Sequence, residues 1–195
     1  MSEVRRLVAL GGSWGGITAL QTILRRLDLP DDAAMVAVLH RQPVRSPLVD
    51  VLTRGSGYPV EEAEDKTSLR PGRVYVAPPD YHLLVEPGWL SLSTEEPVRY
   101  SRPSIDVLLE SAADAFADRV VAVILTGASD DGTAGARAVH RRGGTVIVQD
   151  PKSAEQPVMP RSVVEAGLGD HVAPLGDLAA VIAAAVRGRS RKGPA

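Results

Sequence analysis

The sequence contains no cysteine, which excludes disulfide bonds and thiolate chemistry. It also lacks any apolar run approaching the roughly 20 residues that a membrane-spanning helix needs. A strand-like run begins within a few residues of the N-terminus, so no signal peptide is expected. No charge of one sign dominates, because the net charge is -2, and neither nucleic acid nor a membrane surface is expected as a partner. These absences predict a soluble, cytoplasmic protein.

The composition that is present is that of an ordinary globular domain. Hydrophobic residues make up 44% of the 195 positions and charged residues 24%. A chain of this length is sufficient for one sizeable core. We therefore expect a single domain over residues 1–186, followed by a basic, solvated and disordered tail over residues 187–195.

Apolar strand-like runs alternate with helical patterns along most of the chain. The runs expected to form strands are Leu7–Leu10, Ala34–Leu39, Val120–Leu125, Thr145–Val148 and the short His171–Ala173. Helical patterns begin near Ile17, Ile105, Thr133, Pro160 and Leu178. This alternation is typical of the α/β class, with a doubly wound, mostly parallel sheet covered by helices on both faces.

The middle of the chain has a different pattern. Short strand-like pieces occur at Val60–Glu64, Arg73–Ala77, His82–Glu86 and Trp89–Ser93, separated by proline and glycine pairs. The pair Pro87-Gly88 suits a hairpin turn. We expect a small antiparallel hairpin insert here, or an extension of the main sheet.

A glycine-rich turn, Gly11-Gly-Ser-Trp-Gly-Gly16, joins the first strand-like run to the first helical pattern. A serine flanked by glycines between a strand and a helix is the nucleophile-elbow arrangement, in which a tight backbone leaves no room for neighbouring Cβ atoms. The helix N-terminus offers N–H groups to an oxyanion. Ser13 is therefore the candidate nucleophile. Two alternatives stay open: a phosphate-binding turn, although the glycine spacing fits neither common nucleotide motif, and a serine that only caps the helix.

A serine nucleophile needs a base, and the sequence offers four histidines. His40 directly follows a buried strand, at the predicted sheet edge that also carries Ser13. His140 lies in the last turn of a helical pattern, His171 opens a late strand, and His82 lies in the middle segment. We therefore expect His40 to be the general base.

The segment Leu125-Thr-Gly-Ala-Ser-Asp-Asp-Gly132 follows another buried strand and supplies adjacent carboxylates. A buried carboxylate here would accept the imidazole N–H, fix its tautomer and stabilise the imidazolium. The alternatives are that Asp130 or Asp131 caps the following helix, or that the pair binds magnesium, for which no accompanying nucleotide loop is present. The order serine, histidine, aspartate differs from that of the α/β hydrolases.

Several separated motifs occur in one order along the chain: Gly11–Gly16, Leu39-His40, Glu61–Asp65, Arg70–Pro78, Arg102–Leu108, Leu125–Gly132 and Met159–Arg161. In these motifs the chain resembles the catalytic domain of the CheB-type protein-glutamate methylesterases of bacterial chemotaxis. The resemblance covers nearly the whole chain. It implies a doubly wound fold with an antiparallel hairpin, a nucleophile at Ser13, a base at His40 and a buried acid at Asp131 rather than Asp130.

The resemblance also implies an activity and partners. The activity is hydrolysis of glutamate methyl esters on methyl-accepting chemotaxis receptors, with release of methanol and, in some members, deamidation of receptor glutamines. No metal or organic cofactor is needed. The expected partners are the methylated helical region of a chemoreceptor or similar signalling protein and a separate regulatory protein. The family's usual receiver domain is not in this sequence, which predicts constitutive activity, control by a partner or excision from a longer protein.

Three positions near the expected site differ from the family pattern: Trp14, Arg41 and Ala128. Because of these differences, two alternative functions stay open. In one, the same three catalytic residues act on another methylated or amidated protein or on a small ester. In the other, the protein is a catalytically silent signalling adaptor. Backbone N–H groups of Trp14 or near Ala128 are expected to hold an oxyanion. Asp80 and His82 lie in a family-like Pro-x-Asp-x-His stretch, and a structural role is expected for both.

Overall fold

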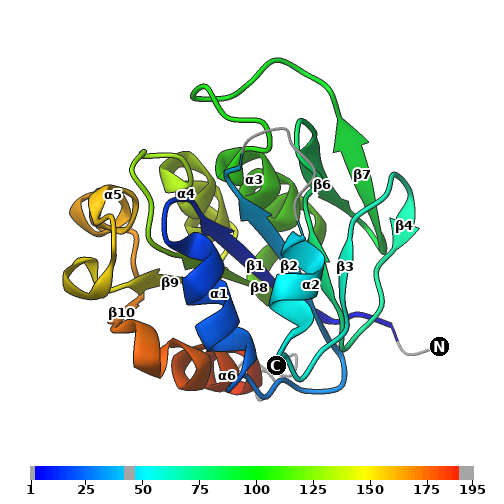
Figure 1. The fold of residues 1–195 in the computed structure, drawn as a ribbon, viewed down its shortest axis with the longest axis horizontal. Helices are drawn as coiled ribbons and strands as arrows, with labels where there is room; N and C mark the ends of the chain where they lie inside the picture. The colour runs from blue at the N-terminus through cyan, green and yellow to red at the C-terminus, as the bar shows by residue number, and fades with distance from the viewer. Residues whose placement is uncertain (1–2, 42–46, 189–195) are drawn as a thin grey trace.

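A computed structural model describes residues 3–41 and 47–188 (Figure 1). Its centre is a seven-stranded sheet in which each pair of neighbouring strands is parallel. In spatial order the strands are β10 (His171–Ala173), β9 (Thr145–Gln149), β8 (Val120–Ile124), β1 (Arg6–Gly12), β2 (Ala33–Leu39), β5 (Val74–Val76) and β3 (Val60–Glu62). The expected doubly wound α/β fold is confirmed.

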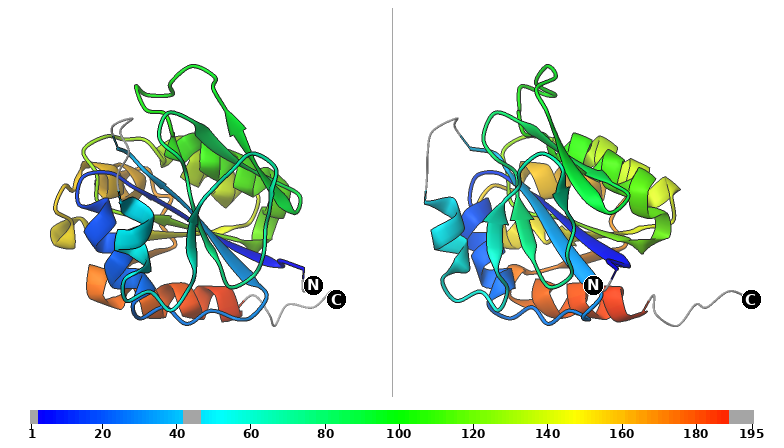
Figure 2. Two further views of the ribbon diagram at one scale, coloured as in Figure 1. Left: turned by 45° about the vertical axis from the view of Figure 1, so that its right-hand side comes forward. Right: turned by 90° about the vertical axis from the view of Figure 1, so that its right-hand side faces the viewer.

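Helices cover both faces of this sheet (Figure 2). One face carries α1 (Gly16–Leu24), α2 (Leu48–Thr53) and α6 (Leu178–Gly188), and the other carries α3 (Ile105–Phe116), α4 (Thr133–Arg141) and α5 (Val158–Glu165). Short 3-10 helices lie at η1 (Ala117–Arg119), η2 (Pro151–Ser153) and η3 (Leu175–Asp177). Alternate side chains of β1 enter the two layers, with Leu7 on the α3 side and Val8 on the α1 side. Burial on both faces explains the continuous apolar runs of the sequence.

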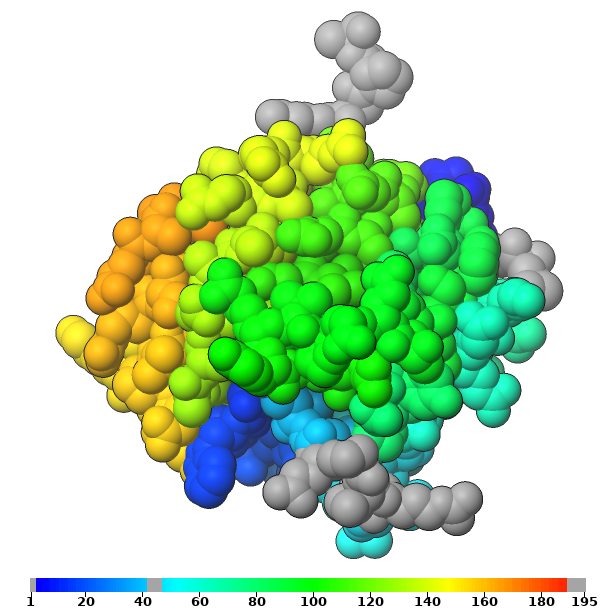
Figure 3. Space-filling model, turned by 90° about the horizontal axis from the view of Figure 1, so that it is seen from above, coloured from blue at the N-terminus to red at the C-terminus, as the bar shows by residue number. Residues whose placement is uncertain are grey.

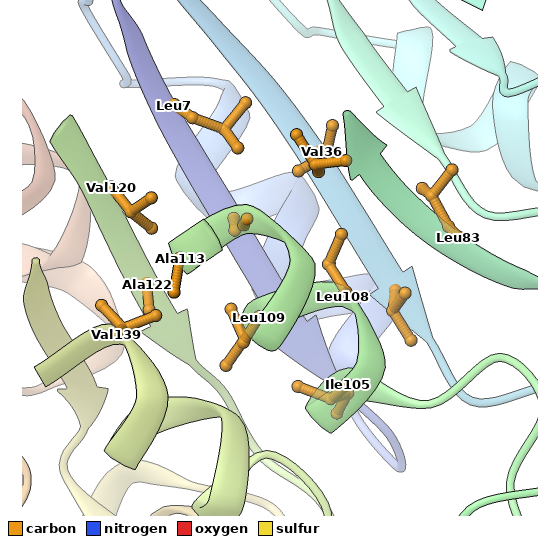
Figure 4. Packing of buried hydrophobic residues seen from close by; sticks show 14 of the residues in the cluster. Leu7, Val36, Leu83, Ile105, Leu108, Leu109, Ala113, Val120, Ala122 and Val139 are labelled. Atoms are coloured by element: carbon orange, nitrogen blue, oxygen red, sulfur yellow. The ribbon is translucent and has the colours of Figure 1, made fainter. Parts of the chain in front are cut away.

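Helix α3 packs across the centre of the sheet, where Leu108 and Leu109 lie over neighbouring strands (Figure 4). Its first residue, Ile105, lies against the end of β1. A Cβ atom on Gly11 would lie 2.3 Å from Ile105 Cγ2. Glycine at position 11 therefore allows the N-terminus of α3 to contact the strand end that leads to Ser13.

The middle segment divides between two sheets. Strands β6 (His82–Glu86) and β7 (Trp89–Ser93) form the expected antiparallel hairpin, and β4 (Thr67–Ser68) pairs with the other edge of β7. Strands β3 and β5 instead extend the main sheet in parallel. An insert and an extension of the sheet are therefore both present.

Two features at the level of single elements differ from expectation. Helix α2 was not expected, because its six residues are too few for a helical period to stand out. Arg187 and Gly188, expected in the disordered tail, belong to α6, and residues 189–195 of that tail lie outside the described residues. Of the helices in the described ranges, none combines the length and the apolar character needed to cross a membrane.

Strands β8, β1 and β2 are neighbours, and their carboxyl ends meet at one edge of the sheet. Strand β2, which follows β1 in the sequence, pairs with one edge of β1, and the later strand β8 pairs with its other edge. The strand order therefore reverses at β1. Ligands of open α/β sheets bind outside the strand ends at such a point. Figure 3 views the molecule from this side, where the green segment that precedes α3 lies beside the blue start of α1 and the light blue end of β2.

Candidate active site

Backbone hydrogen bonds align the three segments that carry the candidate residues. Ser13 N–H donates to Thr126 O at 2.9 Å, and His40 N–H donates to Gly12 O at 3.0 Å. These bonds continue the pairing of β1 with its two neighbours beyond the strands themselves. The turn after β1 therefore lies between the residue that follows β2 and the loop that follows β8.

The glycine-rich turn is short, because β1 ends at Gly12 and α1 begins at Gly16. Gly15 has φ +80°, and α1 begins at Gly16, one residue later. A Cβ atom on Gly15 would lie 2.7 Å from Glu155 Oε2. The N-cap of α1 is Gly15, with no side-chain cap hydrogen bond, so the alternative in which Ser13 only caps this helix is wrong.

His40 and Asp131 are in direct contact. His40 Nε2 lies 2.7 Å from Asp131 Oδ2, and the two side chains are 14% and 0% exposed. Asp130, by contrast, is 53% exposed and pairs with Arg99. Of the two adjacent carboxylates, the fold therefore brings Asp131 to the imidazole.

The Asp131 carboxylate is held by the start of α3. It accepts hydrogen bonds from Ser104 Oγ at 2.9 Å, from Ile105 N–H at 2.8 Å and from Asp106 N–H at 2.9 Å. Burial acts to raise the Asp131 pKa, but the hydrogen bonds from His40 and from the α3 backbone outweigh it, and the pKa lies below its ordinary value. Asp131 is therefore a carboxylate that stays ionised although it is buried.

Asp106, in the first turn of α3, makes the reciprocal contact with α4. Its Oδ1 accepts from Gly132 N–H at 2.9 Å and from Gly135 N–H at 2.8 Å. Burial is the main cause that raises the Asp106 pKa, and the negative charge of Asp131 raises it further, against these two N–H groups and Arg99. Each aspartate thus binds the N-terminus of the helix that begins beside the other.

The orientation of the imidazole follows from these contacts. Because Asp131 is ionised, His40 Nε2–H is the donor, and the lone pair of the neutral ring lies on Nδ1. Nδ1 lies 3.5 Å from Ser101 Oγ, at the outer limit of a hydrogen bond. Within residues 3–41 and 47–188, the Ser13 hydroxyl forms no hydrogen bond with His40. Ser13 and His40 therefore lie at the ends of adjacent strands, and their side chains are not hydrogen-bonded to each other.

A cavity of ≈ 450 Å³ adjoins His40. Its lining residues are His40, Arg41, Asp80, Pro97, Tyr100, Ser101, Arg102 and Pro103. Two of them are paired across the wall, since Arg102 Nη2 donates to Asp80 Oδ1 at 2.7 Å. Arg41, whose side chain is mostly buried, donates to Glu62 Oε2 at 2.6 Å. The cavity thus carries two guanidinium groups and one carboxylate.

Trp14 forms the rim on the nucleophile side. Its side chain is exposed, and its Nε1–H donates to Glu155 Oε1 at 2.5 Å. Thr126 Oγ1 donates to Trp14 O at 2.9 Å and accepts from Gln156 N–H at 2.8 Å. Through these two hydrogen bonds, Thr126 links both the glycine-rich turn and the segment at residue 156 to the end of β8.

The other histidines lie away from Ser13. His82 is buried, where its Nδ1 accepts from Ser104 N–H at 3.2 Å and its Nε2 donates to Glu96 O at 3.1 Å. It thus links β6 to the start of α3, in keeping with a structural role. His140 is half-exposed near Asp170, and His171 is exposed on β10. Across the described residues, no group of three or more His, Asp or Glu side chains is arranged to hold a metal ion.

Sequence reasoning missed three residues of this site: Ser101, Ser104 and Asp106. The motif around Ser104 contributed to the family resemblance and suited a helix start, but it did not indicate the contact of Ser104 with Asp131, which spans 27 positions of the chain. An aspartate in the first turn of a helix is a common local signal, and it does not reveal that its partners belong to a second helix.

Comparison with known proteins gives a consistent result. The family model described as CheB methylesterase matches residues 8–182. A putative protein-glutamate methylesterase/protein-glutamine glutaminase of Leptospira interrogans is 42% identical over 175 residues, covering 88% of this chain and 90% of the relative. A protein-glutamate methylesterase/protein-glutamine glutaminase of Thermotoga maritima is 37% identical over 174 residues, covering 87% of this chain and 51% of the relative. This chain therefore spans about half the length of that second protein.

A solved structure agrees with the sequence matches. The crystal structure of the Thermotoga maritima CheB methylesterase catalytic domain superimposes with a TM-score of 0.87 at 35% identity, covering 93% of this chain and 98% of that one. The chain belongs to the CheB methylesterase family, a family of carboxyl-ester hydrolases.

Proposed function

We propose that this member of the CheB methylesterase family hydrolyses glutamate methyl esters on methyl-accepting chemotaxis receptors in the cytoplasm. The observation that carries the proposal is the 2.7 Å contact between His40 Nε2 and the buried Asp131, at the sheet edge where Ser13 follows the adjacent strand. A serine next to an imidazole that is oriented by a buried carboxylate is the arrangement that acyl transfer requires.

In the proposed reaction, His40 Nδ1 takes the Ser13 proton as the hydroxyl oxygen attacks the ester carbonyl. Asp131 stabilises the imidazolium that forms. The imidazolium then gives its proton to the leaving methoxide oxygen, and methanol departs from the acyl-enzyme. Water, activated by the same nitrogen, hydrolyses the acyl-enzyme and leaves a glutamate carboxylate. In this proposal, the hydrogen bond between the Ser13 hydroxyl and Nδ1, which the free protein lacks, forms on substrate binding.

The oxyanion is assigned to the backbone N–H groups of Trp14 and Ala128. In the described part of the chain, neither N–H donates to a protein acceptor. Gly127 brings the second of these groups close to the nucleophile, because a Cβ atom on Gly127 would lie 3.0 Å from Ser13 Cβ. Each donor of this kind contributes about 3 kcal/mol of transition-state stabilisation.

The same steps apply to a glutamine side chain, with ammonia as the leaving group. Two relatives carry glutaminase in their names beside methylesterase, which supports deamidation as a second reaction of the same site. The acyl-enzyme is identical for both substrates, so Ser13, His40 and Asp131 keep their roles.

The test is methanol release from a methylated chemoreceptor signalling fragment, compared between the wild type and Ser13→Ala. We expect release by the wild type and a loss of at least about 10⁴-fold in the variant. Circular dichroism of both proteins controls for folding. Equal release by the folded Ser13→Ala protein would contradict the assignment of the nucleophile, and no release by the wild type would contradict the proposed substrate.

A further inference from the structure

An exposed two-residue turn stands at the cavity beside His40. Val98 N–H donates to Ser101 O at 3.1 Å, and Ser101 N–H donates to Val98 O at 2.9 Å, which closes a hairpin turn around Arg99 and Tyr100. The φ angles of these two residues are +50° and +63°. Two successive positive φ angles are the mark of a type I′ turn, in which asparagine and glycine are favoured. Here a bulky charged residue and a bulky aromatic residue occupy both positions.

The side chains of Arg99, within the turn, and of Arg102, just after it, hold this strained backbone in place. Arg99 Nε donates to the buried Asp106 at 3.2 Å, and its Nη1 pairs with Asp130. Arg102 donates to Asp80 Oδ1 at 2.7 Å and to Thr94 O at 2.9 Å. Unfavourable backbone conformations persist where the surroundings impose them, and such residues gather at ligand-binding sites. The conformation of the turn is therefore fixed by side-chain contacts. One of them is with Asp106, whose backbone N–H donates to Asp131.

The residue at the tip contributes nothing to the core. Tyr100 is 104% exposed, in a chain whose aromatic content is 4%. It nevertheless lines the cavity together with His40, Arg41 and Arg102. Tyrosine is among the residues that supply most binding energy at protein interfaces, because its ring is large and rigid.

We propose that Tyr100 is a specificity-determining residue that contacts the methylated segment of the protein substrate. This inference rests on the proposed function, since it assumes that a glutamate ester on a protein reaches Ser13. His40 and Tyr100 line one cavity, so a protein segment whose ester reaches His40 would lie against the Tyr100 ring.

The experiment compares two substrates with two matched variants. The substrates are a methylated receptor signalling fragment and the γ-methyl ester of N-acetylglutamate, which carries the same ester without a flanking protein segment. The variants are Tyr100→Gly and Ala117→Gly, because Ala117 also has a positive φ, of +51°, at the far end of α3. Steady-state methanol release gives kcat and KM, and thermal unfolding gives Tm.

We expect Tyr100→Gly to raise KM for the receptor fragment about 10-fold, and to lower the ratio of kcat/KM between fragment and small ester by a similar factor. Its Tm should equal or exceed that of the wild type, because glycine adopts positive φ without strain. Ala117→Gly should match the wild type in both activities. Tyr100→Phe, which retains the ring, should restore most of the affinity for the fragment.

The outcomes separate the two proposals. An active wild type whose KM for the fragment is unchanged in Tyr100→Gly overturns this inference and leaves the proposed function standing. A wild type that hydrolyses the small ester but not the fragment overturns the proposed receptor substrate, and the inference with it. A fall in Tm together with equal losses on both substrates would assign Tyr100 a structural role instead.

Discussion

The two halves of the candidate site are held by different means. On the acid–base side, Asp131 is fully buried and takes four hydrogen bonds, from His40, Ser104 and the backbone of α3. On the nucleophile side, backbone geometry places Ser13, and the neighbouring Trp14 is 65% exposed. The free protein therefore carries a His40–Asp131 pair whose hydrogen bonds are already formed, beside a candidate nucleophile, Ser13, that is half-buried. In the proposed reaction, substrate binding then has to bring about only the hydrogen bond between Ser13 and His40.

The largest effect should come from breaking the acid–base side. In Asp131→Asn, the amide no longer offers an ionised acceptor to His40 Nε2–H, so the ring loses its orientation and the imidazolium its partner. We expect kcat to fall by about 10⁴-fold and the free energy of unfolding to fall by about 2 kcal/mol. Methanol release and urea unfolding measure the two effects. Asp114→Asn, a change at an exposed carboxylate of α3 that pairs with Arg142, is the matched control. Near-normal kcat in Asp131→Asn would contradict the proposed role.

An intermediate effect is expected on the nucleophile side from Gly127→Ala. The added Cβ would lie 2.5 Å from Met159 Cε and 3.0 Å from Ser13 Cβ, so the Met159 side chain or the loop after β8 must shift. We expect the free energy of unfolding to fall by about 1–3 kcal/mol and kcat to fall by about 10² through misplacement of the reacting groups. Gly57→Ala, where no atom lies within 4 Å of the new Cβ, should leave both unchanged. If the two variants behave alike, close packing at residue 127 does not position the nucleophile.

The smallest effect concerns the pH dependence of stability. The pKa of Asp106 is raised above its ordinary value of 3.8, so the folded state binds its proton more tightly than the unfolded state. Its contribution to stability is therefore present below pH 3.8 and is lost as the pH rises through the folded pKa. Asp131 acts in the opposite direction: with a lowered pKa, it stabilises the fold above pH 3.8, and this is lost as the pH falls through the folded pKa.

In Asp106→Asn, the free energy of unfolding should therefore no longer fall as the pH rises above 3.8. Its fall at lower pH, which is due to Asp131, should remain. Urea unfolding midpoints between about pH 3 and pH 7 give the two slopes for the wild type and the variant. Asp114→Asn should retain the slopes of the wild type. A variant in which the acid side of the profile disappears instead would show that Asp106, and not Asp131, is the carboxylate kept ionised.

The sequence was sufficient to bring Ser13 and His40 to one edge of the sheet. Both directly follow continuous apolar runs, and the carboxyl ends of neighbouring parallel strands meet in space. The residues alone did not choose between Asp130 and Asp131. That choice depends on how the loop meets α3. The alternative in which an aspartate caps the following helix was wrong for Asp131, because its carboxylate binds the N-terminus of α3 and not that of α4.

The middle of the fold was harder to predict for a related reason. Strands β3 and β5 have three residues each, which is too short for a pattern to distinguish a parallel from an antiparallel partner. Their place in the main sheet depends on pairing of β5 with β2 and of β3 with β5, and only the folded chain provides these contacts. The hairpin of β6 and β7 was accessible because its turn carries a local signal, Pro87-Gly88.

The crossed contacts of Asp106 and Asp131 tie the amides of two helices into one cooperative unit. Ile105 N–H is bonded to a carboxylate beside α4, and Gly132 N–H to a carboxylate within α3, so neither helix end can fray without releasing charge from the other. Local opening events that expose amides elsewhere to exchange with solvent are thus suppressed at this edge. Because the carboxylate that orients the His40 ring is bound to the N-terminus of α3, opening of that helix end would also release the ring.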